Sequence, residues 1–332
     1  MVNVGIIGCG GVARAHARAI GRFPDRAKLV AVADVVEEQR RPFAEQYGAM
    51  AYSRAEDLLA AGDVNCVVIS LPHDLHASYA VMAAQAGKDI LLEKPMAANV
   101  GECDEILEAV ERAGVKLSVG HSYRYYDGCQ AAKAILDSGE VGDLVFAIST
   151  FSKNWGIDKR RGWHLERGRG GGMWQANGIH SVNTLMWFAG SPVVAVKGSS
   201  ALRFHTPEQM DADDASMALL QHANGAHTVS LVTGYRRGAP KDMVELTCTG
   251  GMLRCERKRL WVGLDEQWTE RPVETEDDKV REWAEFLTYL EGSGPCPVPG
   301  TEARHTVQVL KAVEQSSTTG REIRLDKEVE RD

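Results

Sequence analysis

Six residues near the start of the chain constrain its fold more than any other feature. Gly8–Ala13 read G-C-G-G-V-A, a G-x-G-x-x-A pattern that directly follows the apolar run Val4–Ile7 and opens a helical pattern. In such a unit the first glycine permits a tight turn, the second lets the backbone approach a pyrophosphate, and the final small residue allows close packing of helix on strand. The free amides and the positive end of the helix favour the anion. The sequence therefore predicts a dinucleotide-binding turn made by Gly8, Gly10, Gly11, Val12 and Ala13.

An acidic residue at the end of the second apolar run predicts which dinucleotide binds. Asp34 lies 21 residues beyond Ala13. A carboxylate there can accept hydrogen bonds from the adenosine ribose and would repel a 2′-phosphate, so we expect NAD to be preferred over NADP. The alternative is that Asp34 caps the helix expected at Val35–Phe43. Arg40 and Arg41 lie a turn or more into that helix and weaken the NAD prediction only slightly.

Short apolar runs alternate with helical patterns over the first 120 residues. The runs lack a clean polar–apolar alternation, which is typical of strands buried on both faces of a parallel sheet. They lie at Val4–Ile7, Leu29–Ala33, Cys66–Ile69, Ile90–Leu92 and Lys116–Val119. Alternating β and α segments, with a helix at Val100–Val110 among them, predict a doubly wound parallel sheet, the Rossmann architecture, in a domain of residues 1–120.

The pattern changes after about residue 120. Few helices separate the next strand-like runs, which predicts a second domain, residues 121–332, built on a larger and mostly antiparallel sheet. These runs are Val145–Phe151, Val193–Ser199, Ser216–Leu220, Thr228–Leu231 and Val244–Thr249. Arg160–Gly172, rich in Gly and Arg, is expected to be a loop. Late helices are expected at Val280–Leu290 and Glu302–Gln315, and packing of the second back on the first domain is left open.

Composition excludes several classes of protein. The 332 residues suit about two domains, and a net charge of −8 lacks the basic footprint of a nucleic-acid binder. No apolar run is long enough to span a membrane, and no basic segment followed by a long apolar segment suggests a secretory signal. The cysteines number seven, without any C-x-x-C, which argues for reduced thiols. We therefore expect a cytoplasmic protein without a disulfide framework or a zinc knuckle.

Further motifs make a family visible. L-P-H-D-L-H-A at Leu71–Ala77, A-G-K-D-I-L-L-E-K-P at Ala86–Pro95 and G-G-G-M-W-Q-A-N-G-I-H at Gly170–His180 join the glycine turn, and T-G-R-E-I-R-L closes the pattern at Thr319–Leu325. With these motifs the chain resembles the Gfo/Idh/MocA family, named for glucose–fructose oxidoreductase and inositol dehydrogenase. The resemblance implies a Rossmann domain and an α/β domain with an open, mixed sheet. One face of that sheet covers the nicotinamide and the other commonly makes subunit contacts, so a homodimer or homotetramer is expected.

The resemblance also implies a catalytic pair, Lys94 and His180. A lysine ammonium beside the nicotinamide can stabilise a developing alkoxide, and a histidine can accept the hydroxyl proton as hydride leaves the carbinol carbon. The residues expected on the cofactor side are Ser70, Leu71, Pro72, His73, His76, Glu93 and Lys94. His73 and His76 form an H-x-x-H pair, but no third ligand is suggested and we expect no metal.

One position departs from the family pattern. Many sugar and inositol dehydrogenases of the family carry Asp four residues before the catalytic histidine, and this chain has Ala176. Four residues apart on a helix, such an Asp could orient His180 and stabilise its charged form, whereas Ala can do neither. Asn177 could hydrogen-bond the substrate or the ring, but as a neutral amide it would not raise the histidine pKa as a carboxylate does. Lys94 therefore carries more of the work here, or the substrate differs from a plain polyol.

Aromatic and polar side chains are expected around the substrate. Tyr123, Trp163, His164 and Asn177 join Lys94 and His180, since an aromatic face suits a sugar ring and polar groups suit its hydroxyls. Packing between domains is the alternative for each.

Four arginines, Arg160, Arg161, Arg167 and Arg169, lie in one loop. These arginines either recognise a carboxylate or phosphate of the substrate or form a solvated loop with salt bridges between subunits.

Together these features predict an NAD-dependent oxidoreductase that oxidises a secondary hydroxyl of a sugar, inositol or related cyclic polyol. Two alternatives stay open. One is an NAD-bound glycosidase or lyase that oxidises and re-reduces the same substrate. The other is a non-catalytic NAD-sensing regulator on the same fold.

Overall fold

The computed structural model describes residues 1–160, 162–235 and 237–325, which form two compact units. The first unit comprises Met1–Ser122 together with Asp277–Arg304, and the second comprises Tyr123–Glu276 and the described residues from His305 onward. The expected boundary at residue 120 lies close to the first division. The stretch Asp277–Arg304, expected in the second domain, packs instead with the first unit.

The first unit is a six-stranded parallel sheet in the order β3-β2-β1-β4-β5-β6, which confirms the doubly wound prediction. Its strands are β1 (Val2–Ile7), β2 (Ala27–Ala33), β3 (Met50–Tyr52), β4 (Cys66–Ile69), β5 (Asp89–Glu93) and β6 (Leu117–Gly120). Its helices are α1 (Gly11–Ile20), α2 (Glu37–Tyr47), α3 (Ala55–Ala60), α4 (His76–Gln85), α5 (Val100–Ala113) and α8 (Asp278–Leu290). Every residue of β4 is buried, as an apolar strand covered on both faces should be.

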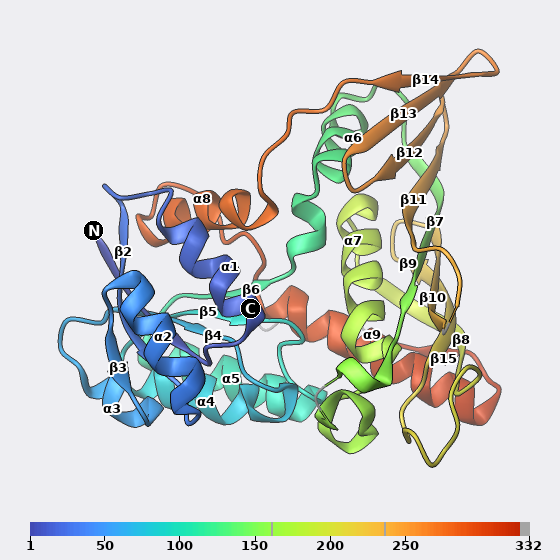
Figure 1. Ribbon diagram of the computed structural model, residues 1–332. Helices are drawn as coiled ribbons and strands as arrows, with labels where there is room; N and C mark the ends of the chain where they lie inside the picture. The colour runs from blue at the N-terminus through green and yellow to red at the C-terminus, as the bar shows by residue number, and fades with distance from the viewer. Residues whose placement is uncertain (161, 236, 326–332) are drawn as a thin grey trace. The chain divides into compact units, whose positions relative to one another are not determined.

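Helices cover both faces of this sheet, as Figure 1 shows. On one face the core joins Val4 and Ile6 of β1 with Phe43 of α2 and with Trp283 and Phe286 of α8. On the other face Gly5 leaves space that Leu58 of α3 fills, since a Cβ at Gly5 would lie 2.7 Å from Leu58 Cδ2. The apolar stripe of α8 therefore completes the first unit's core, although this helix comes late in the chain.

The second unit is built on a nine-stranded sheet in the order β14-β13-β12-β11-β7-β10-β9-β8-β15. Only β7 and β10 pair in parallel, so the mixed and mostly antiparallel prediction is confirmed. The strands are β7 (Leu144–Asn154), β8 (Val193–Ala201), β9 (Ala215–His222), β10 (His227–Tyr235), β11 (Lys241–Cys248), β12 (Met252–Glu256), β13 (Arg259–Leu264), β14 (Gln267–Arg271) and β15 (Ile323–Arg324). The helices are α6 (Asp127–Ser138), α7 (Ile179–Ala189) and most of α9 (Gly300–Thr319).

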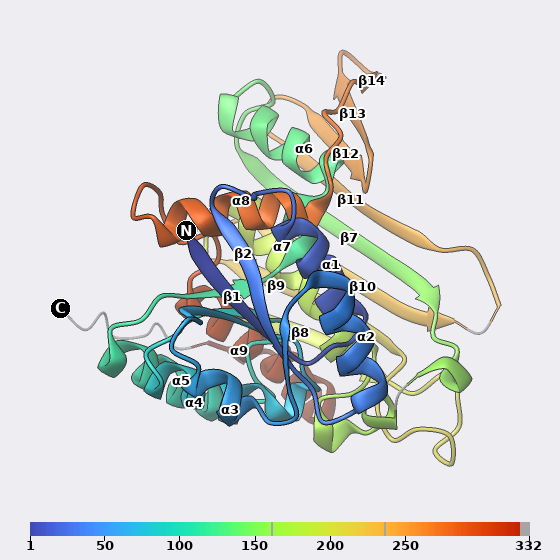
Figure 2. The same ribbon diagram turned by 60° about the vertical axis from the view of Figure 1, so that its left-hand side comes forward.

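Helices cover one face of the nine-stranded sheet, and Figures 1 and 2 both show α6 and α7 on that face. The backbone of α6 lies so close to β12 that a Cβ at Gly128 would fall 2.0 Å from the carbonyl oxygen of Glu256. Along β10 residues alternate between buried and half-buried, as expected for a sheet with one covered face.

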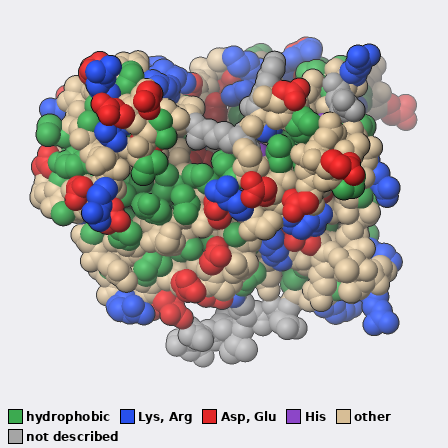
Figure 3. All heavy atoms as spheres, turned by 60° about the horizontal axis from the view of Figure 1, so that its bottom comes forward, with side chains coloured by type: hydrophobic (Ala, Val, Ile, Leu, Met, Phe, Trp, Pro, Cys, Tyr) green, Lys and Arg blue, Asp and Glu red, His purple; other side chains and the backbone are tan. Residues whose placement is uncertain are grey.

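The surface carries mixed charges. On the face drawn in Figure 3, acidic and basic side chains are interspersed with hydrophobic ones. Within the described residues, no helix is both long enough and apolar enough to cross a bilayer.

Candidate functional site

The glycine turn has the geometry that the sequence predicts. Gly8 ends β1 with a left-handed φ of 93°, and a Cβ there would lie 2.3 Å from the carbonyl oxygen of Ser70. No L side chain fits that space. Gly10 precedes the first residue of α1, and nothing lies within 4 Å of a Cβ built at Gly11. The N-terminus of α1 is thus open to an anion, while Ala13 is fully buried against the sheet.

Asp34 ties the glycine turn to the second strand. Its Oδ2 accepts a hydrogen bond from the Cys9 N–H at 2.8 Å, and its Oδ1 accepts one from the Val36 N–H at 2.8 Å. The second bond resembles the capping alternative, although α2 itself begins at Glu37. Each carboxylate oxygen can accept a further bond, so both remain able to receive ribose hydroxyls. The Arg40 guanidinium also lies here and donates to the Asp34 carbonyl oxygen at 2.6 Å.

The other predicted cofactor-side residues follow β4 and β5. Ser70, Leu71, Pro72 and His73 follow β4, and Glu93 and Lys94 lie at the end of β5. The carboxyl ends of β1, β2, β4 and β5 therefore carry all the candidate positions, and this edge is where doubly wound sheets bind ligands.

His76 is held by the backbone around the candidate site. The ring is fully buried, with Nδ1 2.7 Å from the Pro95 carbonyl oxygen and Nε2 2.9 Å from that of Leu71. A neutral ring carries one N–H, so it donates to one of these two carbonyl oxygens. His76 thus lies between the loop after β4 and the segment that follows Lys94, and its expected contact with the cofactor stays a prediction.

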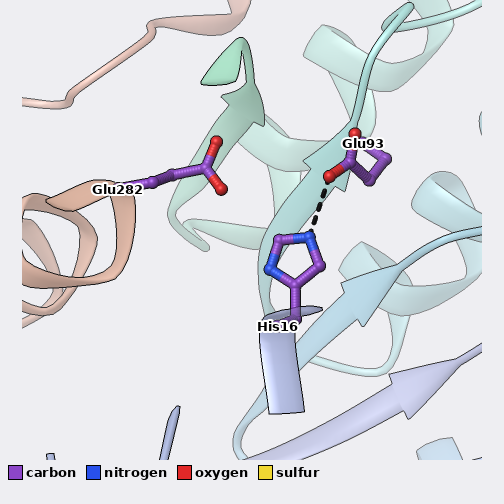
Figure 4. A group of neighbouring side chains, drawn as sticks. All are labelled: His16, Glu93 and Glu282. Carbon is purple, nitrogen blue, oxygen red and sulfur yellow. Dashed lines mark hydrogen bonds and ion pairs between the residues drawn. The ribbon is translucent and has the colours of Figure 1, made fainter. Parts of the chain in front are cut away.

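A buried charge network lies behind Glu93. The Lys279 ammonium is 2.7 Å from Oε1 of Glu93 and 2.7 Å from Oε2 of Glu282. His16 Nε2 lies 2.8 Å from the same Glu93 oxygen, as Figure 4 shows, and the Trp283 indole N–H donates to His16 Nδ1 at 3.0 Å. An indole N–H can only donate, so Nδ1 is the acceptor and the proton of neutral His16 sits on Nε2.

Burial and charge set the protonation of this network. Burial lowers the pKa of His16 to about 4, so the ring is neutral near pH 7. Burial raises the pKa of Glu282 to about 7, with the Lys279 charge opposing the rise. Burial would likewise raise the pKa of Glu93, but the charge of Lys279 and the His16 hydrogen bond hold it well below the usual value. Glu93 is therefore the anion that faces both Lys279 and His16.

His16, Glu93 and Glu282 also form a group with metal-ligand chemistry, because their donor atoms lie within 4.8 Å of one another. The Lys279 ammonium bridges the two carboxylates at hydrogen-bond distance. A cation is thus already supplied by the chain, and we assign this group to an ion-pair network.

Lys94 follows that network directly and is half-buried. The pKa of its ammonium is lowered to about 8: desolvation is the main cause, the Glu93 carboxylate opposes it, and the Lys279 charge adds to the lowering. An ordinary lysine stays protonated until far higher pH. Lys94 can therefore act as a cation near neutral pH and still exchange a proton in the physiological range.

In the second unit the structure brings together Tyr123, Asn177 and His180. The rings of Tyr123 and His180 stack with centroids 3.8 Å apart and 10° between their planes. A hydrogen bond from the Asn177 side chain also acts on the Tyr123 hydroxyl, whose pKa burial raises above its usual value. Asn177 and His180 are both buried. Three of the expected substrate-side residues thus share one cluster.

The backbone before His180 is not the plain helix expected. Trp174–Gly178 form a single π-helical turn, and α7 begins after it. Ala176 and Asn177 lie in this wider turn, and such turns occur frequently at functional sites. The Ala176 side chain is buried and supplies no carboxylate to the histidine, as the sequence indicated.

The backbone geometry of the glycine run before that turn requires glycine at two positions. A Cβ at Gly171 would lie 2.6 Å from the His164 carbonyl oxygen, and Gly172 has a φ of 98°. The Gly172 N–H donates to that same carbonyl at 2.9 Å. Trp163 and His164 stack on each other with centroids 3.6 Å apart, so His164 covers one face of the indole. At most the other face of Trp163 remains for a sugar ring.

The arginines of the loop have separate roles. Arg167 donates to the Asp211 carbonyl oxygen, and Arg169 lies 3.9 Å from a Glu166 carboxylate oxygen, so both have partners within the chain. Arg160 stacks its guanidinium 4.0 Å above the Trp155 ring centroid. Arg161 lies outside the described residues. The loop itself, Arg160–Gly172, contains short 3₁₀ turns at Gly162–Leu165 and Arg167–Arg169.

Sequence reasoning missed Lys279, Glu282 and His16. The two charged residues lie on a helix whose apolar stripe was read as core, and they flank Trp283 within that stripe. A lysine and a glutamate three residues apart beside buried aromatics could have been a signal. Nothing local indicated that their partner is Glu93, which is 186 residues away from Lys279.

Comparison with known proteins adds an independent line of evidence. Residues 2–121 match a family model described as an oxidoreductase family with an NAD-binding Rossmann fold, and residues 129–254 match the GFO/IDH/MocA C-terminal domain. Glucose-6-phosphate 3-dehydrogenase of Bacillus subtilis is 30% identical over 161 residues, which are 48% of this chain and 45% of that protein. The chain thus matches less than half the length of this curated relative. Inositol 2-dehydrogenase 3 of Saccharopolyspora erythraea is 24% identical over 93% of this chain and 95% of its own length.

Solved structures share the fold. An NAD binding oxidoreductase from Klebsiella pneumoniae superimposes with a TM-score of 0.89 at 24% identity, covering 98% of this chain and 100% of the other. Family models match residues of both units of the chain. The chain therefore belongs to the Gfo/Idh/MocA family of NAD-binding oxidoreductases.

Proposed function

We propose that the protein is an NAD-dependent dehydrogenase that oxidises a secondary hydroxyl of a sugar, inositol or related cyclic polyol. The observation that carries the proposal is Lys94: a half-buried side chain directly after β5, at the ligand-binding edge, whose ammonium pKa is lowered to about 8, chiefly by desolvation. The names of relatives, such as inositol 2-dehydrogenase 3 and glucose-6-phosphate 3-dehydrogenase, support this substrate class.

The glycine turn supports a dinucleotide as cofactor. The space above Gly8 excludes any side chain, and the N-terminus of α1 is open. When bound, the nicotinamide ring would accept hydride from the carbinol carbon of the substrate. The chain would contribute the pyrophosphate contacts of Gly8, Gly10 and Gly11, with Ser70–His73 and Glu93 bordering the cofactor.

Lys94 and His180 then divide the work on the substrate hydroxyl. The Lys94 ammonium hydrogen-bonds the hydroxyl oxygen and stabilises the negative charge that develops as the C–H bond breaks. His180 accepts the hydroxyl proton, held by its stack on Tyr123. Because Ala176 gives His180 no carboxylate, we assign a larger share of charge stabilisation to Lys94. The Asn177 amide Oδ1 is buried without a hydrogen-bond partner among the described residues, so a substrate hydroxyl can serve it.

Asp34 supports NAD over NADP. The carboxylate would repel a 2′-phosphate, whereas the adjacent Arg40 could attract one, so the two side chains work against each other. We expect kcat/KM for NAD to exceed that for NADP by about tenfold or more, since one charge contact is worth about 1.4 kcal/mol or more. Asp34→Ser should narrow the difference, and Asp57→Ser, on an exposed carboxylate of α3, should leave it unchanged. A wild-type preference for NADP would refute the assignment.

The proposal is tested by following NADH while purified protein acts on myo-inositol, D-glucose, D-galactose and their acid derivatives. Net NADH formation with ketone product supports a dehydrogenase. Substrate loss without net NADH would favour the enzyme that oxidises and re-reduces one substrate. NAD binding with no turnover of any compound would favour a regulatory protein.

We also propose that a second copy of this chain covers the helix-free face of the nine-stranded sheet. That face exposes Met217 (54%) and Leu219 (44%) of β9 and Phe146 (38%) of β7. Apolar side chains gathered on the uncovered face of a sheet mark an interaction surface. Light scattering should give a dimer or tetramer, and Leu219→Glu should shift the mass toward the monomer. A wild-type monomer at micromolar concentration would overturn this part of the proposal.

A further inference from the structure

A hollow lined mostly by polar and charged residues lies in the second unit, and none of the roles proposed above involves it. It measures about 1300 Å³ and is lined by Asn154, Gly156, Ile157, Asp158, Arg160, His205, Gln209 and Arg237. Ligand pockets commonly enclose about 300–1,000 Å³, so this space is large enough for a sugar derivative. The lining brings together the ends of β7 and β10 and the segment between β8 and β9.

Two guanidinium groups give the hollow its charge. Arg160 and Arg237 line the hollow, and the Asp158 carboxylate, which carries the opposite charge, lines it too. Arg160 is held by stacking on Trp155, 4.0 Å from its ring centroid, and burial lowers its pKa from the usual value. A guanidinium stays charged in proteins even so. A stacked and partly desolvated arginine binds an anion more strongly than one in bulk water.

Trp155 itself adds a buried donor. The side chain is fully buried, and its indole Nε1 has no hydrogen-bond partner among the described residues. Leaving such a donor unsatisfied is unfavourable, because its hydrogen bond to water is lost without replacement. An oxygen-rich ligand beside Arg160 would be a suitable acceptor.

His205 offers a fixed ring nitrogen. The Asp214 carboxylate is fully buried and accepts three backbone N–H groups, those of Arg203, Phe204 and His205. His205 Nδ1 lies 3.0 Å from Oδ2 of this carboxylate, so we assign the ring proton to Nδ1. Nε2 is then the nitrogen that can serve a ligand, and the side chain of His205, only 2% exposed, cannot turn away easily.

The hollow is joined to the segment that carries His180. Asp213, next to Asp214 in sequence, accepts a hydrogen bond at 2.9 Å from the N–H of Trp174, the first residue of the π-helical turn. Trp155 also contacts the His164 ring edge-on, at 6.4 Å between centroids. Both contacts lie within the second unit, and they link the immediate neighbours of Arg160 and His205 to the turn that carries Asn177.

We propose that the substrate of this enzyme carries an acid group, a carboxylate or a phosphate, which Arg160 and Arg237 bind in this hollow while His205 hydrogen-bonds the same ligand. The inference rests on the proposed dehydrogenase function and narrows its substrate class. A neutral polyol would leave the two guanidinium groups with only the Asp158 carboxylate among the described lining residues to balance them. An acid group would pair with them and fix the orientation of the sugar ring.

The experiment compares binding of D-glucuronate, D-glucose 6-phosphate and neutral D-glucose by calorimetry with full-length protein saturated with NADH. We expect at least one acid to bind about tenfold or more tightly than D-glucose, as one charge-assisted contact predicts. Arg160→Gln and Arg237→Gln should each remove most of that difference. Arg203→Gln, an exposed arginine of the neighbouring segment, should keep it. Arg237 is exposed, so its variant is expected to fold even if Arg160→Gln does not.

The outcomes separate this inference from the function on which it rests. Preference for glucuronate identifies a carboxylate, and preference for glucose 6-phosphate identifies a phosphate. Equal binding of acids and D-glucose, or unchanged binding in Arg237→Gln, would overturn the inference. If neutral polyols are oxidised with net NADH and the arginine variants match wild type, the function stands and the inference fails. Acid-selective binding without any hydride transfer would instead keep the site and refute the function.

Discussion

The Lys279 ammonium lies 2.7 Å from Oε1 of Glu93, so a helix late in the chain supplies the counter-ion for the carboxylate that precedes Lys94. The same ammonium is 2.7 Å from Glu282, and all three side chains are buried. The chemistry proposed at Lys94 thus depends on a residue that the local sequence does not connect with it.

Removing this counter-ion should destabilise the protein strongly. Lys279→Met would leave a buried carboxylate without its cation, and breaking a buried ion pair from one side typically costs about 3–5 kcal/mol. Urea denaturation measures the loss. Arg41→Met breaks only an exposed pair with Glu45 and should change stability little. Equal losses in the two variants would contradict the network's structural role.

The pH dependence of alcohol oxidation should reflect Lys94. With its pKa lowered to about 8, the ammonium is lost as pH rises through that value, so kcat/KM should fall on the alkaline side. The Glu93 carboxylate raises the Lys94 pKa, so Glu93→Gln should move this fall to lower pH. Glu108→Gln, on an exposed residue of α5, is the control and should keep the wild-type profile. An unmoved alkaline limb in Glu93→Gln would show that another group is responsible.

Acid should weaken the first unit through His16. Its folded pKa of about 4 lies below the usual 6.5 because the ring is buried. Above pH 6.5 the His16 ring is mostly neutral in both the folded and the unfolded protein. As pH falls toward 4, the ring is protonated in the unfolded chain but stays mostly neutral in the folded protein. Stability is therefore lost on acidification, by up to about 3 kcal/mol for this group.

The measurement is the free energy of unfolding in urea at about pH 7.5 and about pH 5. His16→Gln should show a smaller decrease between the two conditions than wild type. His227→Gln, in the second unit, should show the wild-type decrease. If His16→Gln responds to acid as wild type does, His16 is not the group being titrated.

The glycine turn can be tested with a matched control outside it. Gly8→Ala places a Cβ 2.3 Å from the Ser70 carbonyl oxygen at a left-handed φ, so the turn must move. We expect about tenfold or greater loss of NADH affinity and a lower Tm. Gly62→Ala, in the exposed turn after α3, meets nothing within 4 Å and should keep near-wild-type stability and affinity. Fluorescence titration with NADH decides, and equal affinity in Gly8→Ala would show that the turn does not hold the pyrophosphate.

Much of the fold could be predicted because its signals are local. The run Cys66–Ile69 appears as β4 with the same bounds, and the run Val244–Thr249 lies mostly within β11, which begins at Lys241, since buried strands require continuous or alternating apolar residues. Short or exposed strands gave no such signal: β3 has three residues, and all of β14 is exposed. The membership of α8 in the first unit was also missed, because an apolar stripe shows that a helix packs without showing on what.

The candidate site likewise contains residues that sequence motifs predict and residues that only the folded structure brings together. Gly8, Asp34 and Lys94 were found because motifs fix their spacing, and Tyr123, Asn177 and His180 cluster as expected. The His16–Lys279–Glu282 network and the His205–Asp214 pair depend on contacts that only the folded chain makes. The motif of His76 predicts a cofactor-side loop, but it could not show that the ring nitrogens lie near the carbonyl oxygens of Pro95 and Leu71.

The central claim is that the Lys94 ammonium stabilises the negative charge that develops on the substrate oxygen while hydride passes from an alcohol to NAD. The most direct measurement is single-turnover NADH formation in wild type and Lys94→Met, with NAD affinity determined in parallel for each. The account predicts net NADH in wild type, loss of at least about a hundredfold in the variant, which corresponds to about 2.7 kcal/mol, and NAD affinity within about tenfold of wild type. Near-wild-type turnover in Lys94→Met, or no NAD affinity in the wild-type protein, would contradict it.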